Sequence, residues 1–135
     1  MGEVRSVTIE PKYHKDNGLI VFDIEQGAEI FGFDPVESLM VQLPAGVTGG
    51  NHSHLRYEAF IALSAGAELH WIDETGKTHI EEMIVGEETT AFIVPPHVPH
   101  AITNTLLRDS IALIEYGSQQ QELADVTREI VIPLH

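Results

Sequence analysis

The sequence has no cysteine, few basic residues and no long apolar run, and each of these absences excludes a class of protein. Without cysteine, the chain can form no disulfide framework, no zinc ribbon and no thiol nucleophile. Seven Lys and Arg stand against 21 Asp and Glu, a formal charge of −14. We therefore expect no nucleic acid or membrane partner, because phosphate groups are bound by clustered basic side chains. No apolar run approaches the roughly 18 residues that a membrane span requires.

The length and the apolar content fit one folded domain. A chain of 135 residues can bury roughly two thirds of its unfolded surface in a core. The hydrophobic fraction of 43% is too high for a disordered acidic tail. There is neither a repeat nor a low-complexity linker, so we expect residues 1–135 to form a single domain. The N-terminal residues lack the apolar segment of a signal peptide, so we expect a cytoplasmic protein.

Short runs of β-forming residues alternate with turn signals along the chain. Asp73–Lys77 separates two such runs and predicts a hairpin loop with Gly76 at a positive φ. Only Gln119–Asp125 has the pattern of a helix, and that pattern is short. Many short strands at regular spacing favour an all-β sandwich or barrel over alternating strands and helices. The predicted strands are Val4–Ile9, Leu19–Ile24, Leu39–Leu43, Tyr57–Leu63, Leu69–Ile72, Thr78–Ile84, Ala91–Val94, Ile111–Tyr116 and Ile130–Ile132.

The first candidate site residues are two histidines and a glutamate in one short stretch. Side chains two apart on a strand point to the same face, so His52 and His54 can aim their imidazoles at one point. Glu58 has the same parity, but a straight strand would place it about 13 Å from His54. Ligands lie only about 2.0–2.2 Å from an ion such as zinc. Glu58 can therefore join the histidines only if the chain bends between Leu55 and Tyr57.

The second candidate segment, Pro95–Asn104, contains three prolines in five residues. Proline excludes helix and central strand, so we expect a stiff loop that delivers His100 into the next strand. His100 could then complete a set of three histidines and one glutamate, which suits Mn, Fe, Ni, Co or Zn. On an octahedral ion this set leaves one or two positions for substrate or water. A histidine pair two residues apart is, on its own, more often a solvated strand face.

The spacing of the first segment resembles the first motif of the cupin superfamily. That motif reads Gly, five residues, His-x-His, three or four residues, Glu, six residues, Gly. Gly46, His52, His54 and Glu58 match it, and the closing glycine, Gly66, comes one residue late.

The second segment resembles the second cupin motif, which reads Gly, five residues, Pro-x-Gly, two residues, His, three residues, Asn. Pro95, His100 and Asn104 match it, whereas Gly86 stands eight residues before Pro95. His97 replaces the usual glycine, so we expect a positive φ there, which histidine tolerates.

The resemblance to cupins covers about half of the chain and implies both a fold and a metal. The implied fold is a double-stranded β-helix, a jelly-roll barrel built as one cupin domain. The implied cofactor is one divalent transition metal. The resemblance also implies a homodimer, since cupins of this size usually pair. The implied metal ligands are His52, His54, Glu58 and His100.

Cupins host many activities, so the fold alone leaves the function open. The leading hypothesis is a metal-dependent enzyme that acts on an unidentified small molecule in the barrel. The metal would serve as a Lewis acid or as a template for an oxygen ligand, and the reaction type stays open. A non-enzymatic binding or sensor protein, with a small-molecule ligand, is a further possibility.

An alternative is a metal-independent sugar-nucleotide isomerase or epimerase of polysaccharide biosynthesis, with histidines as acid and base. Asp16–Val21, Pro44–Gly46 and Gly50–His54 are similar to the small deoxysugar ketoisomerases and to cupin domains of capsular-polysaccharide enzymes. Two features depart from that group. Gly49 stands where an arginine is usual, and Leu39–Gln42 lacks the expected tyrosines. Few basic residues remain to bind a pyrophosphate.

Overall fold

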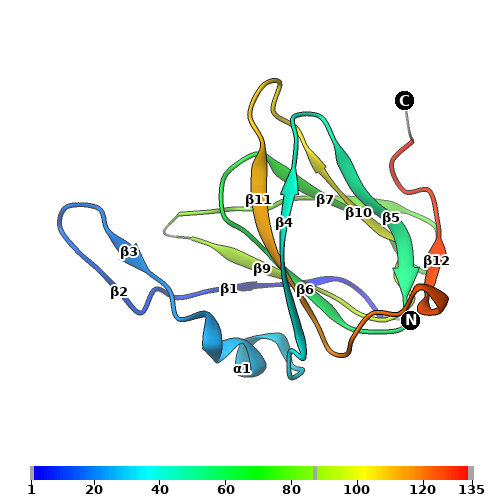
Figure 1. Cartoon of the computed structure of the whole chain (residues 1–135), viewed down its shortest axis with the longest axis horizontal. Helices are drawn as coiled ribbons and strands as arrows, with labels where there is room; N and C mark the ends of the chain where they lie inside the picture. The colour runs from blue at the N-terminus through cyan, green and yellow to red at the C-terminus, as the bar shows by residue number, and fades with distance from the viewer. Residues whose placement is uncertain (1, 87, 134–135) are drawn as a thin grey trace.

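The short β-forming runs fold into two antiparallel five-stranded sheets, in a computed structural model that describes residues 2–86 and 88–133 (Figure 1). The first sheet has the spatial order β1 (Arg5–Thr8), β9 (Thr90–Val94), β6 (Glu58–Ala62), β11 (Ile111–Gly117) and β4 (Glu37–Leu43). The second sheet has the order β12 (Val126–Arg128), β5 (Thr48–His54), β10 (His100–Asn104), β7 (Ala67–Ile72) and β8 (Thr78–Glu82). The protein is therefore an all-β jelly roll, as predicted.

Smaller elements precede β4 and follow β11. The hairpin of β2 (Tyr13–His14) and β3 (Ile20–Val21) extends away from the two sheets in Figure 1. It is followed by the 3₁₀-helix η1 (Ile24–Gln26) and the short helix α1 (Gly27–Phe31), and the 3₁₀-helix η2 (Leu123–Asp125) precedes β12. The helices of the described residues are all too short to cross a membrane.

Three sequence predictions need correction. The strand predicted at Leu19–Ile24 shrinks to β3, because the chain turns into η1 at Ile24. The helix predicted at Gln119–Asp125 is only the single turn η2. The strand predicted at Ile130–Ile132 is wrong. Its backbone is bound by a side chain of β5 instead of by a neighbouring strand, and β12 forms a few residues earlier.

Some strands bury every second residue and others bury every residue, depending on how many of their faces are covered. In β7 the burial alternates along the strand, since one face packs into the barrel and the other faces outward. Every residue of β6 and β9 is buried, because these central strands are covered on both faces. Their outer face packs against a second cluster that includes Ile9, Phe31 and Tyr116. The N-terminal segment and α1 thus cover the back of the first sheet.

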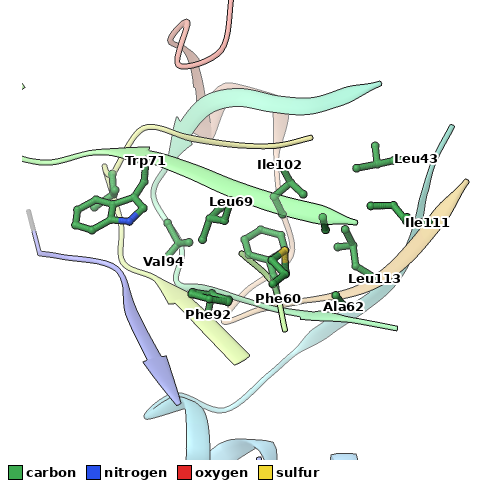
Figure 2. Close-up of a cluster of buried hydrophobic side chains, with 13 residues drawn as sticks. Leu43, Phe60, Ala62, Leu69, Trp71, Phe92, Val94, Ile102, Ile111 and Leu113 are labelled. Carbon is green, nitrogen blue, oxygen red and sulfur yellow. The ribbon is translucent and has the colours of Figure 1, made fainter. Parts of the chain in front are cut away.

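The barrel interior holds the main hydrophobic core. Figure 2 shows Phe60 and Phe92 of the first sheet close to Leu69 and Trp71 of the second. Leu113 and Ile102 extend this core along the barrel. These side chains, contributed by both inner faces, hold the sheets against each other and so fix the positions of the polar residues described below.

Strand β5 contains a local irregularity directly before His52. Gly50 and Asn51 have φ of 96° and 57°, and the pairing of β5 with β10 shifts register between His100 and Ala101. A Cβ at Gly50 would lie 3.0 Å from the His100 carbonyl oxygen and 3.1 Å from Ala101 Cα. Only glycine therefore allows the two strands to approach so closely where the histidines begin.

The side chain of Asn51 ties the C-terminal segment to β5. Its Oδ1 accepts hydrogen bonds from the backbone N–H groups of Val131 and Ile132 at 2.9 and 2.8 Å, and its Nδ2 donates to the Ile132 carbonyl at 2.9 Å. This segment replaces the strand that the apolar run predicted. It keeps β12 beside the histidines of β5.

We predict that Gly50→Ala destabilises the protein more than Gly76→Ala does. Both glycines have a positive φ, but a Cβ at Gly76 meets nothing within 4 Å. Gly76→Ala should therefore lower the free energy of unfolding only by the cost of a left-handed backbone at alanine, about 1–2 kcal/mol. Gly50→Ala adds a clash with the β10 backbone, and we expect about 1–3 kcal/mol more. Urea unfolding of both variants measures the difference, and equal losses would contradict the close approach of β5 and β10.

Candidate functional site

Four polar side chains from the two facing sheets converge inside the barrel. His52 and His54 lie on β5 and His100 begins β10, where it pairs with His52 across the ladder. Glu58 begins β6 of the opposite sheet. One ligand atom from each of the four lies within 4.8 Å of the others. The structure thus brings together the four residues that the sequence singled out, while their role as metal ligands stays a prediction.

The glutamate reaches the histidines because the chain bends after β5. Leu55 and Arg56 leave the strand geometry, and β6 then starts in the other sheet. The expected bend between Leu55 and Tyr57 is therefore present. It places Glu58 Oε1 at 2.6 Å from His54 Nε2 and 3.3 Å from His100 Nε2.

The backbone fixes how two of the imidazoles are oriented. His54 Nδ1 lies 3.2 Å from the Arg56 carbonyl oxygen, and His100 Nδ1 lies 2.9 Å from the Val98 carbonyl oxygen. A carbonyl oxygen only accepts, so each Nδ1 carries a proton and donates it. In the neutral imidazole the lone pair then belongs to Nε2, which faces Glu58.

Three acceptor atoms therefore face one another in a buried space. His54 Nε2, His100 Nε2 and Glu58 Oε1 have no hydrogen-bond partner among the described residues. The side chains of these residues are at most 2% exposed. Buried acceptors without a donor are costly, so this arrangement requires a cation between them, either a metal ion or a proton carried by an imidazole.

The surroundings of Glu58 and His52 shift the pKa of both side chains. Burial raises the pKa of Glu58, but the imidazoles of His100 and His54, when protonated, outweigh burial and lower it well below its usual range. Burial, together with the charges of His100 and His54, lowers the pKa of His52 from 6.5 to about 4. His52 is therefore neutral at neutral pH and can accept a proton or bind a metal.

Two further residues lie next to this cluster: Arg56, a neighbour of the candidate site already in the sequence, and Glu115, which sequence reasoning missed. Arg56 is buried and donates to Glu58 Oε2 from Nε at 2.9 Å. Glu115 on β11 lines the same cavity as His52 and His100. Burial, followed by the charge of Glu58, raises the pKa of Glu115 to about 7, although the charge of Arg56 opposes both. An acidic residue inside the apolar run of β11 was the sequence signal that could have found it.

His52 separates an inner cavity from an outer groove. The inner cavity, of about 80 Å³, is largely apolar and lies within the barrel beside His52, His100 and Glu115. The outer groove, of about 330 Å³, is bounded by Thr48 of β5 and Arg128 of β12. Both are bordered by Gly50 and His52. Gly50 and His52 therefore form the boundary between the cavity and the groove.

Three histidines outside the cluster have roles in the local structure. His97 has a φ of 70°, which confirms the positive φ expected where cupins usually have glycine. His79 stacks on Trp71 with ring centroids 4.1 Å apart and contacts Asp73 at 2.7 Å. His70 pairs with Glu68 at 3.1 Å on the outer face of β7.

The fold was compared with known proteins. No family model and no curated protein matches the sequence. Among solved structures, the sugar 3,4-ketoisomerase QdtA from Thermoanaerobacterium thermosaccharolyticum, in complex with TDP, has a TM-score of 0.72 and 18% identity, covering 92% of this chain and 88% of that one. WlaRA, a TDP-fucose-3,4-ketoisomerase from Campylobacter jejuni, has a TM-score of 0.72 and 14% identity, with 95% and 90% covered.

A third similar structure is that of an epimerase. ChmJ, a 3'-monoepimerase from Streptomyces bikiniensis in complex with dTDP-quinovose, has a TM-score of 0.72 and 17% identity, covering 91% of this chain and 67% of that one. At these identities the likeness shows the fold alone. The chain has the cupin fold, as its two motifs imply.

Proposed function

We propose that this protein is an isomerase or epimerase of a sugar nucleotide, which moves a proton next to a carbonyl group. The proposal draws support from a likeness over more than nine tenths of the chain to enzymes with that type of activity. The observation that carries it is the position of His52, a neutral imidazole between the inner cavity and the outer groove. The expected homodimer and the cytoplasmic location stay predictions.

The chemistry needs one base and one acid that both reach the same small substrate. A base removes the proton from the carbon next to the carbonyl, and an acid donates a proton to the carbonyl oxygen, which gives an enediol. The isomerisation is completed when the other hydroxyl group of the enediol loses its proton and the former carbonyl carbon gains one, without an oxidant or reductant. In an epimerisation the proton returns to the original carbon from the opposite face. His52 is suited to accept the proton, and His100, which borders the same cavity, to donate one.

The outer groove offers a place for the nucleotide part. Arg128 is exposed there, and it is the cationic side chain among the residues that line the groove. A guanidinium can bind a diphosphate through paired hydrogen bonds. Arg128 would compensate in part for Gly49, which stands where the resemblance to ketoisomerases predicts an arginine.

The facing acceptors support a second candidate, a metal-dependent enzyme acting on a small carbonyl compound. Three imidazole nitrogens and one carboxylate oxygen suit a divalent transition metal, and the cluster fits such an ion because its buried acceptors lack donors. Bound there, the metal would polarise a carbonyl oxygen as a Lewis acid. The ligands would be His52, His54, Glu58 and His100.

We expect the protein to catalyse deuterium exchange next to the keto group of TDP-4-keto-6-deoxyglucose in D₂O. His52→Asn should slow the exchange by a factor of about 10²–10⁴, which is the usual effect of removing a general base. His14→Asn, an exposed histidine on β2, is the matched control and should exchange at the wild-type rate. Proton NMR measures the exchange. Wild-type protein that promotes none would refute the proposal.

Chelation separates the two candidates. A metal-independent isomerase keeps its exchange rate when EDTA has lowered the metal content below about a tenth of an equivalent. A metal-dependent enzyme loses the activity and regains it with one added divalent ion per chain. If the four residues bind that ion, an excess of 100 times its Kd raises the unfolding free energy by about 2.7 kcal/mol. His100→Asn should abolish this gain in thermal unfolding, whereas His14→Asn should retain it.

A further inference from the structure

The guanidinium of Arg56 lies next to the candidate site, and each of its three nitrogens contacts an acceptor. Its side chain is 1% exposed. Nε and Nη2 contact Glu58 Oε2 at 2.9 and 2.8 Å. Nη1 donates to Glu37 Oε1 at 2.7 Å and to the Gln119 carbonyl at 2.8 Å, and Nη2 donates to Glu115 Oε2 at 3.2 Å. Four of these contacts are hydrogen bonds, and the contact of Nη2 with Glu58 Oε2 is an ion pair.

These contacts distinguish the two oxygens of Glu58. Oε2 faces the two N–H groups of Arg56, whereas Oε1 faces His54 and His100 and has no donor. Rotation of the carboxylate would break the paired contact with a planar, rigid fork. The carboxylate is thus held with one oxygen turned toward the histidines.

We propose that Arg56 is a positioning residue that makes Glu58 a one-oxygen ligand for a divalent metal ion. It occupies Oε2 and leaves Oε1 as the ligand atom. This inference rests on the metal-binding candidate described above and does not depend on the isomerisation.

The backbone of β11 is shaped to hold the guanidinium. Gly117 pairs with Glu58 of β6 on one side and with Glu37 of β4 on the other. A Cβ at Gly117 would collide with Nη1 and Cζ of Arg56 and lie 2.8 Å from Nε. The guanidinium therefore lies against β11 at a position that only glycine leaves free.

The charges of the network favour a cation. Three carboxylates, of Glu37, Glu58 and Glu115, contact one guanidinium. Even with Glu115 protonated, the carboxylates of Glu37 and Glu58 leave one negative charge uncompensated beside Arg56. A cation at Glu58 Oε1 would balance it, whereas a water molecule in that place would not.

Cobalt binding to the purified chain tests the inference through two variants. Arg56→Lys keeps the charge but replaces the fork with a point charge, and Gly117→Ala displaces the guanidinium without changing any charge. Loss of a group that orients a metal ligand usually weakens metal binding about 10–100-fold. We expect that increase in the Kd for Co²⁺ in both variants, together with a changed visible absorption spectrum of bound Co²⁺.

Controls separate positioning from stability. Arg108→Lys, at an exposed arginine, should leave the Kd and the spectrum unchanged. Glu37 contacts Arg56 but not Glu58. The variant Glu37→Gln retains an acceptor oxygen, so it keeps the test possible if the other variants fail to fold. It should raise the Kd by a smaller factor.

A purely structural Arg56 would lower the melting temperature of the metal-free variants and leave the Kd and the cobalt spectrum as in the wild type. That result overturns the inference, as does wild-type protein that binds no Co²⁺. Neither result bears on proton exchange by His52, which is measured without metal.

Discussion

The structure depends on one electrostatic constraint, the convergence of three hydrogen-bond acceptors at Glu58 Oε1. His54 and His100 turn their Nε2 lone pairs inward because backbone carbonyls accept from the opposite nitrogens. The carboxylate lies opposite them because the chain bends after β5. Such an arrangement is stable only with a cation between the acceptors. The site is therefore built to hold positive charge, either a metal ion or a proton that can be transferred.

The rest of the fold keeps this arrangement in place and gives a ligand access to it. The apolar core between the sheets sets the distance between β6 and the histidine strands. Gly50 lets β5 and β10 approach each other closely, two residues before His52 on β5. Asn51 keeps the C-terminal segment beside β5, so that Arg128 borders the outer groove. A small substrate with an anionic part fits these surroundings.

Much of this could be predicted from residue spacing, and the remainder depends on long-range contacts. The alternation of β7, the turn at Gly76 and the four converging residues follow from local pattern and motif spacing. The irregular conformation of Ile130–Ile132 could not be predicted in this way. The hydrogen bonds from the Asn51 side chain, some 80 residues earlier, outweigh the strand propensity of this run. Glu115 was missed for the same reason, since β11 meets β6 only in the folded sheet. The role of Arg56 likewise depends on carboxylates from β4, β6 and β11.

The central claim is that a substrate carbonyl binds between the inner cavity and the groove, next to His52 and His100. A crystal structure with TDP-4-keto-6-deoxyglucose bound tests it most directly. The account predicts the keto group within hydrogen-bond distance of these two imidazoles and the diphosphate along the groove beside Arg128. A sugar nucleotide bound elsewhere, with the cavity beside His52 filled by water alone, would contradict it.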